Sequence, residues 1–336
     1  MRKFLLPEGG CRYKANLHCH TTLSDGCLTP EEVKAAYLAE GYSVVAFTDH
    51  DVLLSHHARL SDAAFIALNG CEVNFTEAEE QPGRNMRRGC HLCLIAKEPD
   101  NLRQVCWYHS KHFDRHEAMI CKEDAPEFNC AYTPEQINEL IRRAHSAGFF
   151  VTYNHPTWSR EDYTRYCAYH GMDAMEIGNY DVLTQGLPEY NDRVYDDMLI
   201  GGERIGCIAT DDNHNKHPGT ACWDSFGCWT MIGAEKLDYR SVTAALEAGA
   251  YYASEGPEIY EFSFEAGKFR IRTSPAARIC FSTGRRHSSL AANADGSPIT
   301  AAEFEPYDRD IYVRAKVIDH RGKAAWTRAY FLDELL

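Results

Sequence analysis

The sequence predicts an α/β protein: a distorted (β/α)7 TIM-like barrel followed by a small C-terminal β-sandwich domain. Three observations predict this fold. Short apolar segments typical of buried strands alternate with helical segments as far as Gly249. Polar residues suited to catalysis follow several of these strands, as they do in α/β barrels. Beyond Pro257 only short alternating segments separated by turn residues remain, so we expect one domain over 1–256 and a second over 257–336.

The composition excludes some classes of protein. The chain has 336 residues, enough for one large and one small domain, and a formal net charge of −14. This negative charge argues against a protein that binds the phosphate backbone of a nucleic acid. It permits a small anionic substrate that binds beside a metal cluster. No apolar run approaches the roughly 20 residues of a membrane span, and the start lacks a signal-peptide core. We therefore expect a cytoplasmic protein, with its 14 scattered cysteines as free thiols.

The first expected strand carries two histidines that can act together. Asn16, Leu17 and Cys19 lie in a mostly apolar run that turn residues follow. Residues two apart in a strand point to the same side, so His18 and His20 project together, as metal chelation requires. Cys19 points the other way, and we expect it to lie in the core.

A helix and a second strand complete the first βαβ unit. Thr29 is the expected N-cap of this helix, with Glu32 as its capping-box partner, and Gly41 ends it. The strand at 43–48 follows and should be parallel to the first. It leads directly into His50.

The remaining elements continue the alternation. We expect further strands of the barrel at 64–74, 90–96, 149–153, 174–177, 204–209 and 223–232. Helices are expected at 52–60, 99–121, 133–147, 160–170, 189–200 and 241–248. These segments make about seven strand–helix units, one short of an eightfold barrel, which favours a distorted barrel. Three histidines of the helix expected at 99–121 should lie on a solvated face: His109, His112 and His116.

The C-terminal part contains expected strands but no convincing helix. The strands are expected at 260–265, 268–273, 277–283, 311–319 and 324–332. Residues 319–322, D-H-R-G, have the composition of a hairpin turn. We expect this part to serve packing or solubility rather than chemistry.

Histidines and carboxylates gather at the ends of the expected strands. They are His18, His20, Asp25, His50, Glu72, His91, His155, Asp212 and His214. This is the face at which α/β barrels place their chemistry. A donor set of imidazoles and carboxylates suits Zn²⁺, Mn²⁺ or Fe²⁺. The set is too large for one tetrahedral metal, so we expect two or three divalent ions.

The motifs that carry these residues resemble the ordered motifs of the PHP (polymerase and histidinol phosphatase) family. They are H-C-H-T-T-L-S-D-G, T-D-H, C-E-V, the isolated His91, N-H-P and D-D-N-H, spread over residues 14–215. The segments A-L-E-A-G-A-Y-Y-A-S-E-G-P-E-I and V-R-A-K-V-I-D-H-R-G-K-A-A-W are similar to the branch with CehA/McbA-type metallohydrolases. The resemblance implies a distorted (β/α)7 barrel and a two- or three-metal centre.

The resemblance also implies how the ligands divide among the metals. One metal would take His18, His20, Glu72 and Asp212; a second would share Glu72 and add His91 and His155; a third would take Asp25, His50 and His214. The family pattern D-x-H selects Asp212 with His214. Asp211, Asp49 and Asp51 would then hold a ligand or a water from behind.

These features predict a metal-dependent phosphoesterase that hydrolyses a small phosphorylated metabolite or nucleotide. The expected nucleophile is a hydroxide that bridges two metals, and Asp212 or His214 would protonate the leaving group. The basic residues expected to contact the anionic substrate are Arg84, Arg88, Arg160 and Lys216.

Two alternatives remain open. The first is a carboxylic ester, carbamate or amide hydrolase of the CehA/McbA type that uses the same metal centre. It would need an aromatic pocket, for which the candidates are Trp158, Tyr180, Trp223 and Trp229. The second is a binding module without activity, against which the complete ligand set argues.

Overall fold

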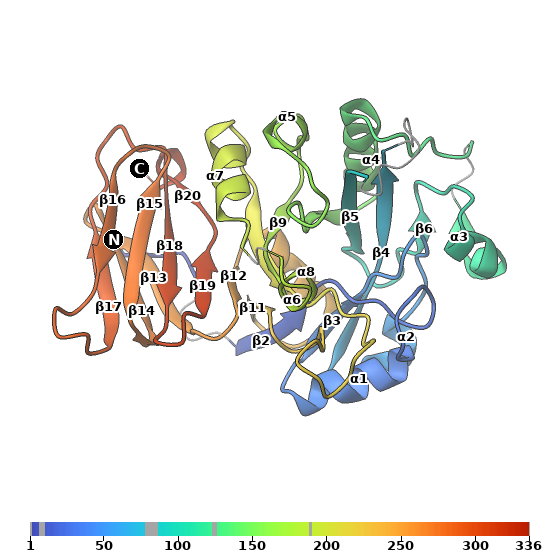
Figure 1. The fold of residues 1–336 in the computed structure, drawn as a ribbon, viewed down its shortest axis with the longest axis horizontal. Coiled ribbons are helices and arrows are strands. Elements are labelled where there is room, and N and C mark those ends of the chain that lie inside the picture. The colour runs from blue at the N-terminus through green and yellow to red at the C-terminus, as the bar shows by residue number, and fades with distance from the viewer. Residues whose placement is uncertain (1, 7–10, 78–86, 123–125, 188–189, 336) are drawn as a thin grey trace.

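The structure is a computed structural model that describes residues 2–6, 11–77, 87–122, 126–187 and 190–335. An α/β part occupies the right-hand side of Figure 1, and a β-rich part that contains both chain termini occupies the left-hand side. One 14-stranded sheet runs through both parts. Within the described ranges, no helix combines the length and apolar character needed to cross a membrane.

Nine strands of this sheet build the α/β part. They are β2 (Cys11–Asn16), β3 (Val44–Phe47), β4 (Ile66–Thr76), β5 (Gly89–Ala96), β8 (Phe149–Asn154), β9 (Ala174–Asn179), β10 (Gly206–Thr210), β11 (Trp229–Ala234) and β12 (Tyr251–Ser254). Their order in the sheet is β10-β9-β8-β5-β4-β3-β2-β11-β12. The parallel pairing of β2 with β3 confirms the predicted βαβ unit. β5 is antiparallel to both of its neighbours, β4 and β8.

These strands surround a common core. A buried cluster includes at least one side chain from each of the nine strands: Ala15, Val44, Leu68, Ile95, Phe150, Ala174, Ile208, Ile232 and Tyr251. The α/β prediction is confirmed. Among the described residues no ladder joins β10 to β11, so the structure shows a large mixed sheet and not the predicted closed barrel. A side chain connects β10 and β11 instead of a backbone ladder. The Thr230 hydroxyl accepts from Ala209 N (3.2 Å) and donates to Ala209 O (2.9 Å).

The helices lie outside this sheet. They are α1 (Pro30–Ala39), α2 (His57–Leu60), α3 (Lys111–His116), α4 (Pro134–Ser146), α5 (Tyr163–Tyr166), α6 (Tyr180–Thr184), α7 (Asp192–Ile200) and α8 (Tyr239–Glu247), with short 3-10 turns at Glu117–Met119 and Leu332–Glu334. The predicted capping box of α1 is present, since Glu32 N donates to the Thr29 hydroxyl and Thr29 N donates to the Glu32 carboxylate. Thr133 caps α4 in the same position.

Three predicted helices are mostly wrong. The segments 52–60, 99–121 and 160–170 contain only the short α2, α3 and α5 as α-helices. In the second segment, the strand β6 (Arg103–Gln104) pairs with β7 (Cys121–Lys122). The Gln104 side chain donates to Asp51 O (2.7 Å) and accepts from Leu53 N (2.8 Å). These two hydrogen bonds join the segments around residues 51–53 and 103–104. Both segments were predicted to be helical, but neither is helical here.

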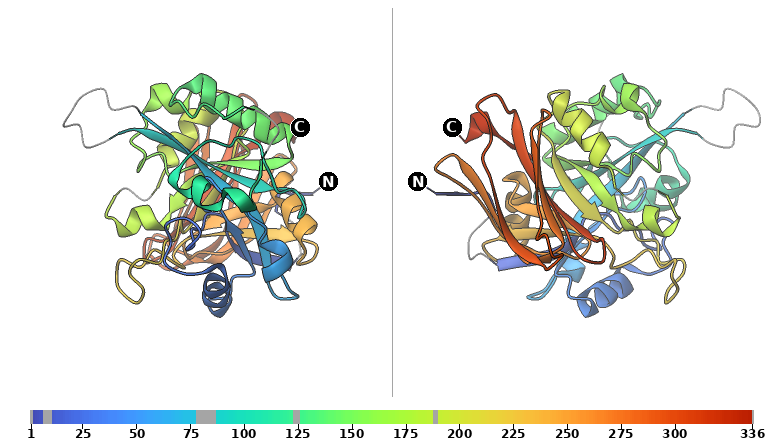
Figure 2. Two further views of the ribbon diagram at one scale, coloured as in Figure 1. Left: turned by 90° about the vertical axis from the view of Figure 1, so that its right-hand side faces the viewer. Right: turned by 60° about the vertical axis from the view of Figure 1, so that its left-hand side comes forward.

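The β-rich part has two layers, which the right-hand view of Figure 2 shows side by side. One layer is a four-stranded sheet of β1 (Lys3–Phe4), β13 (Ile259–Glu265), β14 (Lys268–Ala276) and β17 (Ile299–Phe304). The other continues the large sheet from β12 through β19 (Ala324–Thr327), β18 (Tyr312–Ile318), β15 (Arg278–Thr283) and β16 (Ser288–Ala291), with β20 (Tyr330–Phe331) paired to β18.

Buried aromatic and branched side chains from both layers pack against one another, including Phe262, Phe269, Phe281 and Val317. The predicted turn at 319–322 is confirmed: Asp319 N donates to Lys323 O (3.0 Å), and Gly322 has a φ of 83°.

Candidate metal centre

Three side-chain atoms converge at the centre of the α/β part. His18 Nε2, His20 Nε2 and Asp212 Oδ1 lie 3.1 Å from one another in each of the three pairings. Ligand atoms of a tetrahedral zinc site, each about 2.0–2.1 Å from the metal, stand roughly 3.3 Å apart. This triangle therefore has the dimensions of one face of a metal coordination shell.

The backbone beyond β2 orients the two histidines. The strand ends at Asn16, earlier than the pattern predicts, but the chain stays extended because it is held on both sides. Thr48 N donates to Cys19 O (2.9 Å) on one side, and His20 N donates to Asn213 O (3.0 Å) on the other. His18 and His20 therefore project to one side, and Cys19 is fully buried, as expected.

A second group of donors joins three strands at the same rim. Glu72 Oε1 lies 3.1 Å from His91 Nδ1 and 3.3 Å from His155 Nε2. Glu72 belongs to β4, His91 to the start of β5, and His155 follows β8. Because β5 is antiparallel to its neighbours, its first residues reach the rim at which the neighbouring strands end. His91 thus reaches the site from an amino-terminal strand end.

A third group is more open to solvent. Asp25 Oδ1 lies 3.4 Å from His214 Nε2 and 3.7 Å from His50 Nε2. The imidazole of His20 packs between the two other rings, with centroid distances of 4.3 Å to His50 and 4.4 Å to His214. The Asp25 side chain is 37% exposed, whereas that of Glu72 is 1% exposed.

The carboxylates and imidazoles of the site shift one another's pKa values. Burial raises the pKa of Glu72, but the imidazoles of His18, His91 and His50 outweigh burial and hold its pKa well below the ordinary value. The pKa of His20 is lowered to about 3 by burial and by the neighbouring His50 and His214. Burial lowers the pKa of His50, but the Glu72 and Asp25 carboxylates outweigh burial and raise it to about 9. A cation that binds there must therefore displace a proton from this imidazole.

The donor set fits divalent metals. Glu72 Oε2 is buried and has no hydrogen-bond partner among the described residues, although it lies 2.8 Å from His50 Nδ1. Such an acceptor, surrounded by imidazole nitrogens, is what an absent cation would leave behind.

The structure brings together all nine residues that the sequence predicts as ligands. It also shows that His20 belongs with the open group of Asp25, His50 and His214 as well as with His18 and Asp212.

Glu176 is a residue of the site that the sequence reasoning missed. It is fully buried on β9, and its Oε1 accepts from His18 Nδ1 (2.8 Å) and from Thr210 Oγ1 (2.6 Å). Its Oε2 accepts from His155 N and from Asn179 Nδ2, both at 2.8 Å. A carboxylate at His18 Nδ1 holds the proton on that nitrogen and leaves Nε2 free for a metal. A lone Glu in an apolar strand was the available signal.

Cys93 was also missed. With His18 and Glu72 it forms a group of possible ligand atoms within 4.8 Å of one another. Its thiol accepts from Asn154 Nδ2 at 3.0 Å. Cys93 stands two residues after His91 on β5, so strand alternation points both to the same side, which the sequence could have indicated.

Asp49 and Asp211 were expected to hold a ligand or a water from behind, but the structure shows both of them holding loops. Asp49 accepts from Thr21 N (2.8 Å) and Ser24 Oγ (2.7 Å) in the turn that leads to Asp25. Asp211 accepts from three consecutive backbone N–H groups of residues 226–228, at 2.8–3.0 Å.

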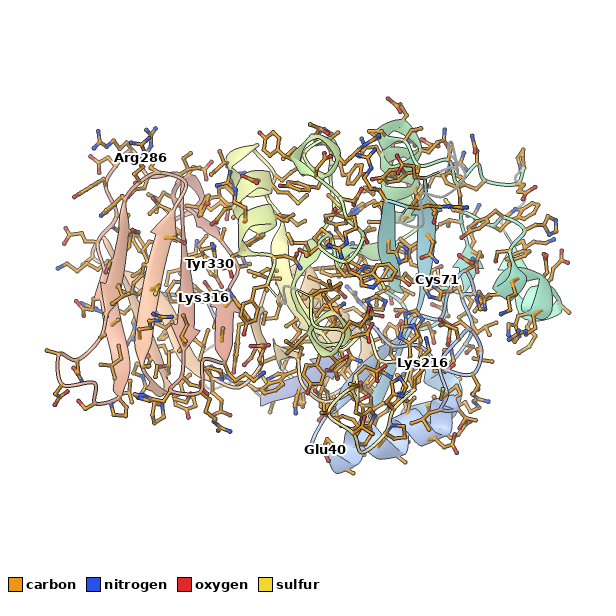
Figure 3. The ribbon with its side chains drawn as sticks, viewed as in Figure 1. Glu40, Cys71, Lys216, Arg286, Lys316 and Tyr330 are labelled. Atoms are coloured by element: carbon orange, nitrogen blue, oxygen red, sulfur yellow. The ribbon has the colours of Figure 1, made fainter. Side chains whose placement is uncertain are left out.

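A pocket of about 480 Å³ opens over the donors. Beyond the donor groups, its described lining consists of Trp158, Asp181, Thr184, Gln185, Lys216, His217, Cys222 and Asp224. Lys216, labelled in Figure 3, is the member of this wall that was predicted to contact an anion.

Arg88 and Arg160, which were also predicted to contact substrate, are not part of the described lining of this pocket. Arg88 pairs with Glu77 (2.8 Å) and Asp162 (3.2 Å), and Arg160 is an exposed residue with a φ of 59°. Arg84 lies outside the described residues.

The histidines of the α3 region differ in their surroundings. His109 is exposed, as expected. His116 Nε2 instead bonds Leu23 O (2.8 Å), and the His112 ring lies 5.8 Å from that of His50. The expectation of a fully solvated face is wrong for these two, because α3 packs beside the loop that carries Asp25.

Comparison with known families gives one match that covers half the chain. The model of the PHP domain matches residues 16–185. An error-prone DNA polymerase of Cutibacterium acnes is 33% identical over 105 residues, 30% of this chain and 9% of the polymerase. A 5'-3' exoribonuclease of Haemophilus influenzae is 48% identical over 79 residues, 24% of this chain and 27% of the nuclease. The matched regions are thus less than a third of each relative.

Solved structures give weaker likenesses. A two-domain protein of Bacteroides vulgatus, containing a predicted PHP-like metal-dependent phosphoesterase, aligns over 98% of both chains with 15% identity and a TM-score of 0.46. An amidohydrolase from Chromobacterium violaceum aligns over 61% of this chain and 88% of its own, with 19% identity and a TM-score of 0.35.

Proposed function

The chain belongs to the PHP domain family, and we propose that it is a metal-dependent hydrolase that cleaves a phosphoester of a small metabolite or nucleotide. One observation carries the proposal: nine imidazole and carboxylate side chains from different parts of the chain meet at one rim of the sheet, under a pocket. A donor set of carboxylates and imidazoles favours hydrolysis by metal-activated water.

The proposed centre holds two or three divalent ions, Zn²⁺, Mn²⁺ or Fe²⁺. Its three donor groups are the triangle of His18, His20 and Asp212, with Glu72 beside it; the group of Glu72, His91 and His155; and the group of Asp25, His50 and His214. When bound, such ions lower the pKa of water to about 7 in favourable cases and offset charge on phosphoryl oxygens.

The protein supplies the proton and the anion contact in this proposal. Hydrolysis forms a bond from phosphorus to the oxygen of water, breaks the bond from phosphorus to the alcohol oxygen, and delivers a proton to that alcohol. Asp212 and His214 both line the pocket, and whichever of them is not bound to a metal is the proposed proton donor. Lys216, with its ammonium 3.7 Å from Asp25 Oδ2, is the proposed contact for a phosphoryl oxygen.

Three further proposals follow from the sequence. The division into a hydrolase domain over 1–256 and a β-sandwich domain over 257–336 is proposed on the strength of the two-layered core of the β-rich part. A small anionic molecule is the proposed partner, in preference to a nucleic-acid polymer, because the chain is acidic. The cytoplasm is the proposed compartment.

One observation favours a second candidate. Trp158 gives the pocket an aromatic wall, and Lys216 is the one Lys or Arg side chain in its described lining. An ester, carbamate or amide hydrolase of the CehA/McbA type would use such a wall for an uncharged substrate.

Parallel assays test the two candidates. Hydrolysis of p-nitrophenyl phosphate and of p-nitrophenyl acetate is measured on protein reconstituted in turn with Mn²⁺, Zn²⁺ and Fe²⁺, with His20→Ala as the control. Metal-dependent phosphate release that the variant loses supports the phosphoesterase. Acetate cleavage alone supports the second candidate, and fewer than about two bound metals per chain with no turnover contradicts both.

A further inference from the structure

A second hollow lies in the β-rich part of the molecule. It has a volume of about 540 Å³, and two loops line it: the turn from β15 to β16 and the connection from β17 to β18. Its described lining consists of Arg285, Arg286, His287, Tyr307, Arg309 and Asp310. In Figure 3, Arg286 lies at the top of the β-rich part, far from Lys216 in the α/β part. The hollow is therefore separate from the pocket over the donor groups.

Three guanidinium groups surround this hollow without acidic partners. Among the residues that the structure describes, Arg285, Arg286 and Arg309 are exposed and form no ion pair, although Arg285 Nε donates to Arg309 O. Other arginines of the same part, such as Arg270 and Arg314, pair with carboxylates at 2.7–3.1 Å. Like charges gathered around one hollow repel one another, and a bound anion removes this repulsion.

The carboxylates of the two loops do not neutralise the hollow. Asp310 is buried, and its Oδ2 accepts from His287 Nδ1 (2.6 Å) and from Tyr307 N (2.8 Å). Glu305 lies 3.2 Å from the ammonium of Lys268. The described lining thus carries three guanidinium groups against one carboxylate, in a chain whose formal net charge is −14.

Hydrogen bonds and ring stacking fix the two loops. The His287 ring stacks on that of Tyr307, with 3.8 Å between the centroids and 10° between the planes. Thr283 Oγ1 accepts from Arg285 N (3.1 Å) and donates to His287 O (2.9 Å). In the second loop, Asp310 N donates to Tyr307 O (2.9 Å). A ligand therefore has mainly the arginine side chains to order, which keeps the entropy cost of binding low.

We propose that this hollow binds a small anion that carries two or more phosphoryl or carboxylate groups. The planar fork of a guanidinium group matches both of these groups through paired hydrogen bonds. A nucleic-acid polymer would need a basic stripe along the surface, whereas these arginines come from two short loops around one hollow. The site lies apart from the metal centre, so the inference does not depend on the proposed function.

Hydrogen exchange measured by mass spectrometry locates the anion on the metal-loaded protein. The probes are pyrophosphate and propane-1,2,3-tricarboxylate, which present phosphoryl and carboxylate groups respectively. We expect saturable protection of the backbone amides in 284–287 and 305–311, and the titration gives Kd. Protection by one probe alone identifies the group that the arginines recognise. Both probes also bind metal ions, an effect that peptides from the donor loops report separately.

Variants test whether the arginines hold the anion. Arg286→Met and Arg309→Met should each raise Kd about 5- to 10-fold, between the values of an exposed ion pair and of a charge-assisted hydrogen bond. Arg286→Lys, which keeps the charge and loses the fork, should give a smaller rise. The matched control is Arg278→Met. Arg278 is exposed at the other end of β15, outside the described lining, so its loss should change Kd by less than about twofold.

The outcomes separate a specific site from general attraction. Protection of both loops that Arg286→Met and Arg309→Met weaken, and that Arg278→Met leaves unchanged, supports the inference. The same change in Kd for all three variants, or no change in any of them, overturns it. Absence of protection by both probes also overturns it, even where an oligoglutamate peptide protects the loops, because that result would assign the hollow to a protein partner.

Discussion

The substitution Glu176→Gln is the sharpest test of how the fold prepares His18 for a metal. The carboxylate of Glu176 accepts four hydrogen bonds, two at each oxygen, and all four partners are donors. A glutamine of the same shape has one acceptor oxygen, and its NH₂ group must face one pair of donors. If it faces His18 Nδ1, the imidazole proton moves to Nε2, the atom 3.1 Å from both His20 Nε2 and Asp212 Oδ1.

A proton on His18 Nε2 competes directly with a cation. Loss of a residue that orients a ligating histidine costs about 10- to 100-fold in metal affinity, which is about 1.4–2.7 kcal/mol. We expect a loss in this range for Glu176→Gln. Equilibrium competition with a chromophoric chelator for Zn²⁺ measures it, and circular dichroism confirms that the variant is folded.

The matched control is Glu161→Gln. Glu161 is a partly buried carboxylate that accepts from the hydroxyls of Tyr132 (2.7 Å), Tyr169 (2.5 Å) and Tyr153. None of the predicted ligands is among its described hydrogen-bond partners. Its substitution should leave zinc affinity within about twofold, well inside the range above. Unchanged affinity in Glu176→Gln, or equal losses in the two variants, would refute the reasoning.

Three further changes have defined outcomes. A methyl group in Gly26→Ala would lie 2.5 Å from His20 O, so the loop bearing Asp25 must shift, and metal analysis should show fewer ions bound per chain. Arg314→Met leaves Asp192 and Asp196 without their buried partner, and urea unfolding should show a loss of about 3–5 kcal/mol, against less than about 1 kcal/mol for the half-exposed Arg204→Met. Burial raises the pKa of Glu161 above 4.5 despite its tyrosine donors, so the folded state favours the protonated form. Wild-type stability should therefore fall as pH rises from 4.5 to the raised pKa, and Glu161→Gln should remove that fall.

Opposite results would contradict each of these expectations. Full metal content in Gly26→Ala would show that the loop adapts at no cost to the open group. Equal losses in the two arginine variants would mean that burial does not decide the value of these ion pairs. An unchanged pH profile in Glu161→Gln would place the titration elsewhere.

Local signals predicted much of the fold correctly. Capping residues located α1 and α4, and apolar runs located most strands of the α/β part, because caps and buried strands depend on neighbouring residues. The same signals failed for 99–121, where the side chain of Gln104 bonds backbone that lies some fifty residues earlier. They also missed β16 and β17, which are short and partly exposed.

In the candidate site, too, the sequence indicated some residues and not others. The nine predicted ligands were visible because imidazoles and carboxylates at strand ends have a recognisable spacing. The carboxylate behind His18 was not visible, because Glu176 lies 158 residues further along the chain and meets it only across the sheet. The surroundings of Arg88 were also not visible in the sequence, since its acidic partners Glu77 and Asp162 come from separate segments.

The sequence by itself determined the type of chemistry, because residue identity decides which atoms can bind a metal and strand alternation decides which of them share a side. The tertiary structure alone decided the order of strands, the antiparallel entry of β5 that brings His91 to the rim, and the contrast in the pocket between Lys216 and Trp158. These features depend on contacts between segments that are distant in sequence. Such contacts produce no periodic pattern of residues in a single sequence.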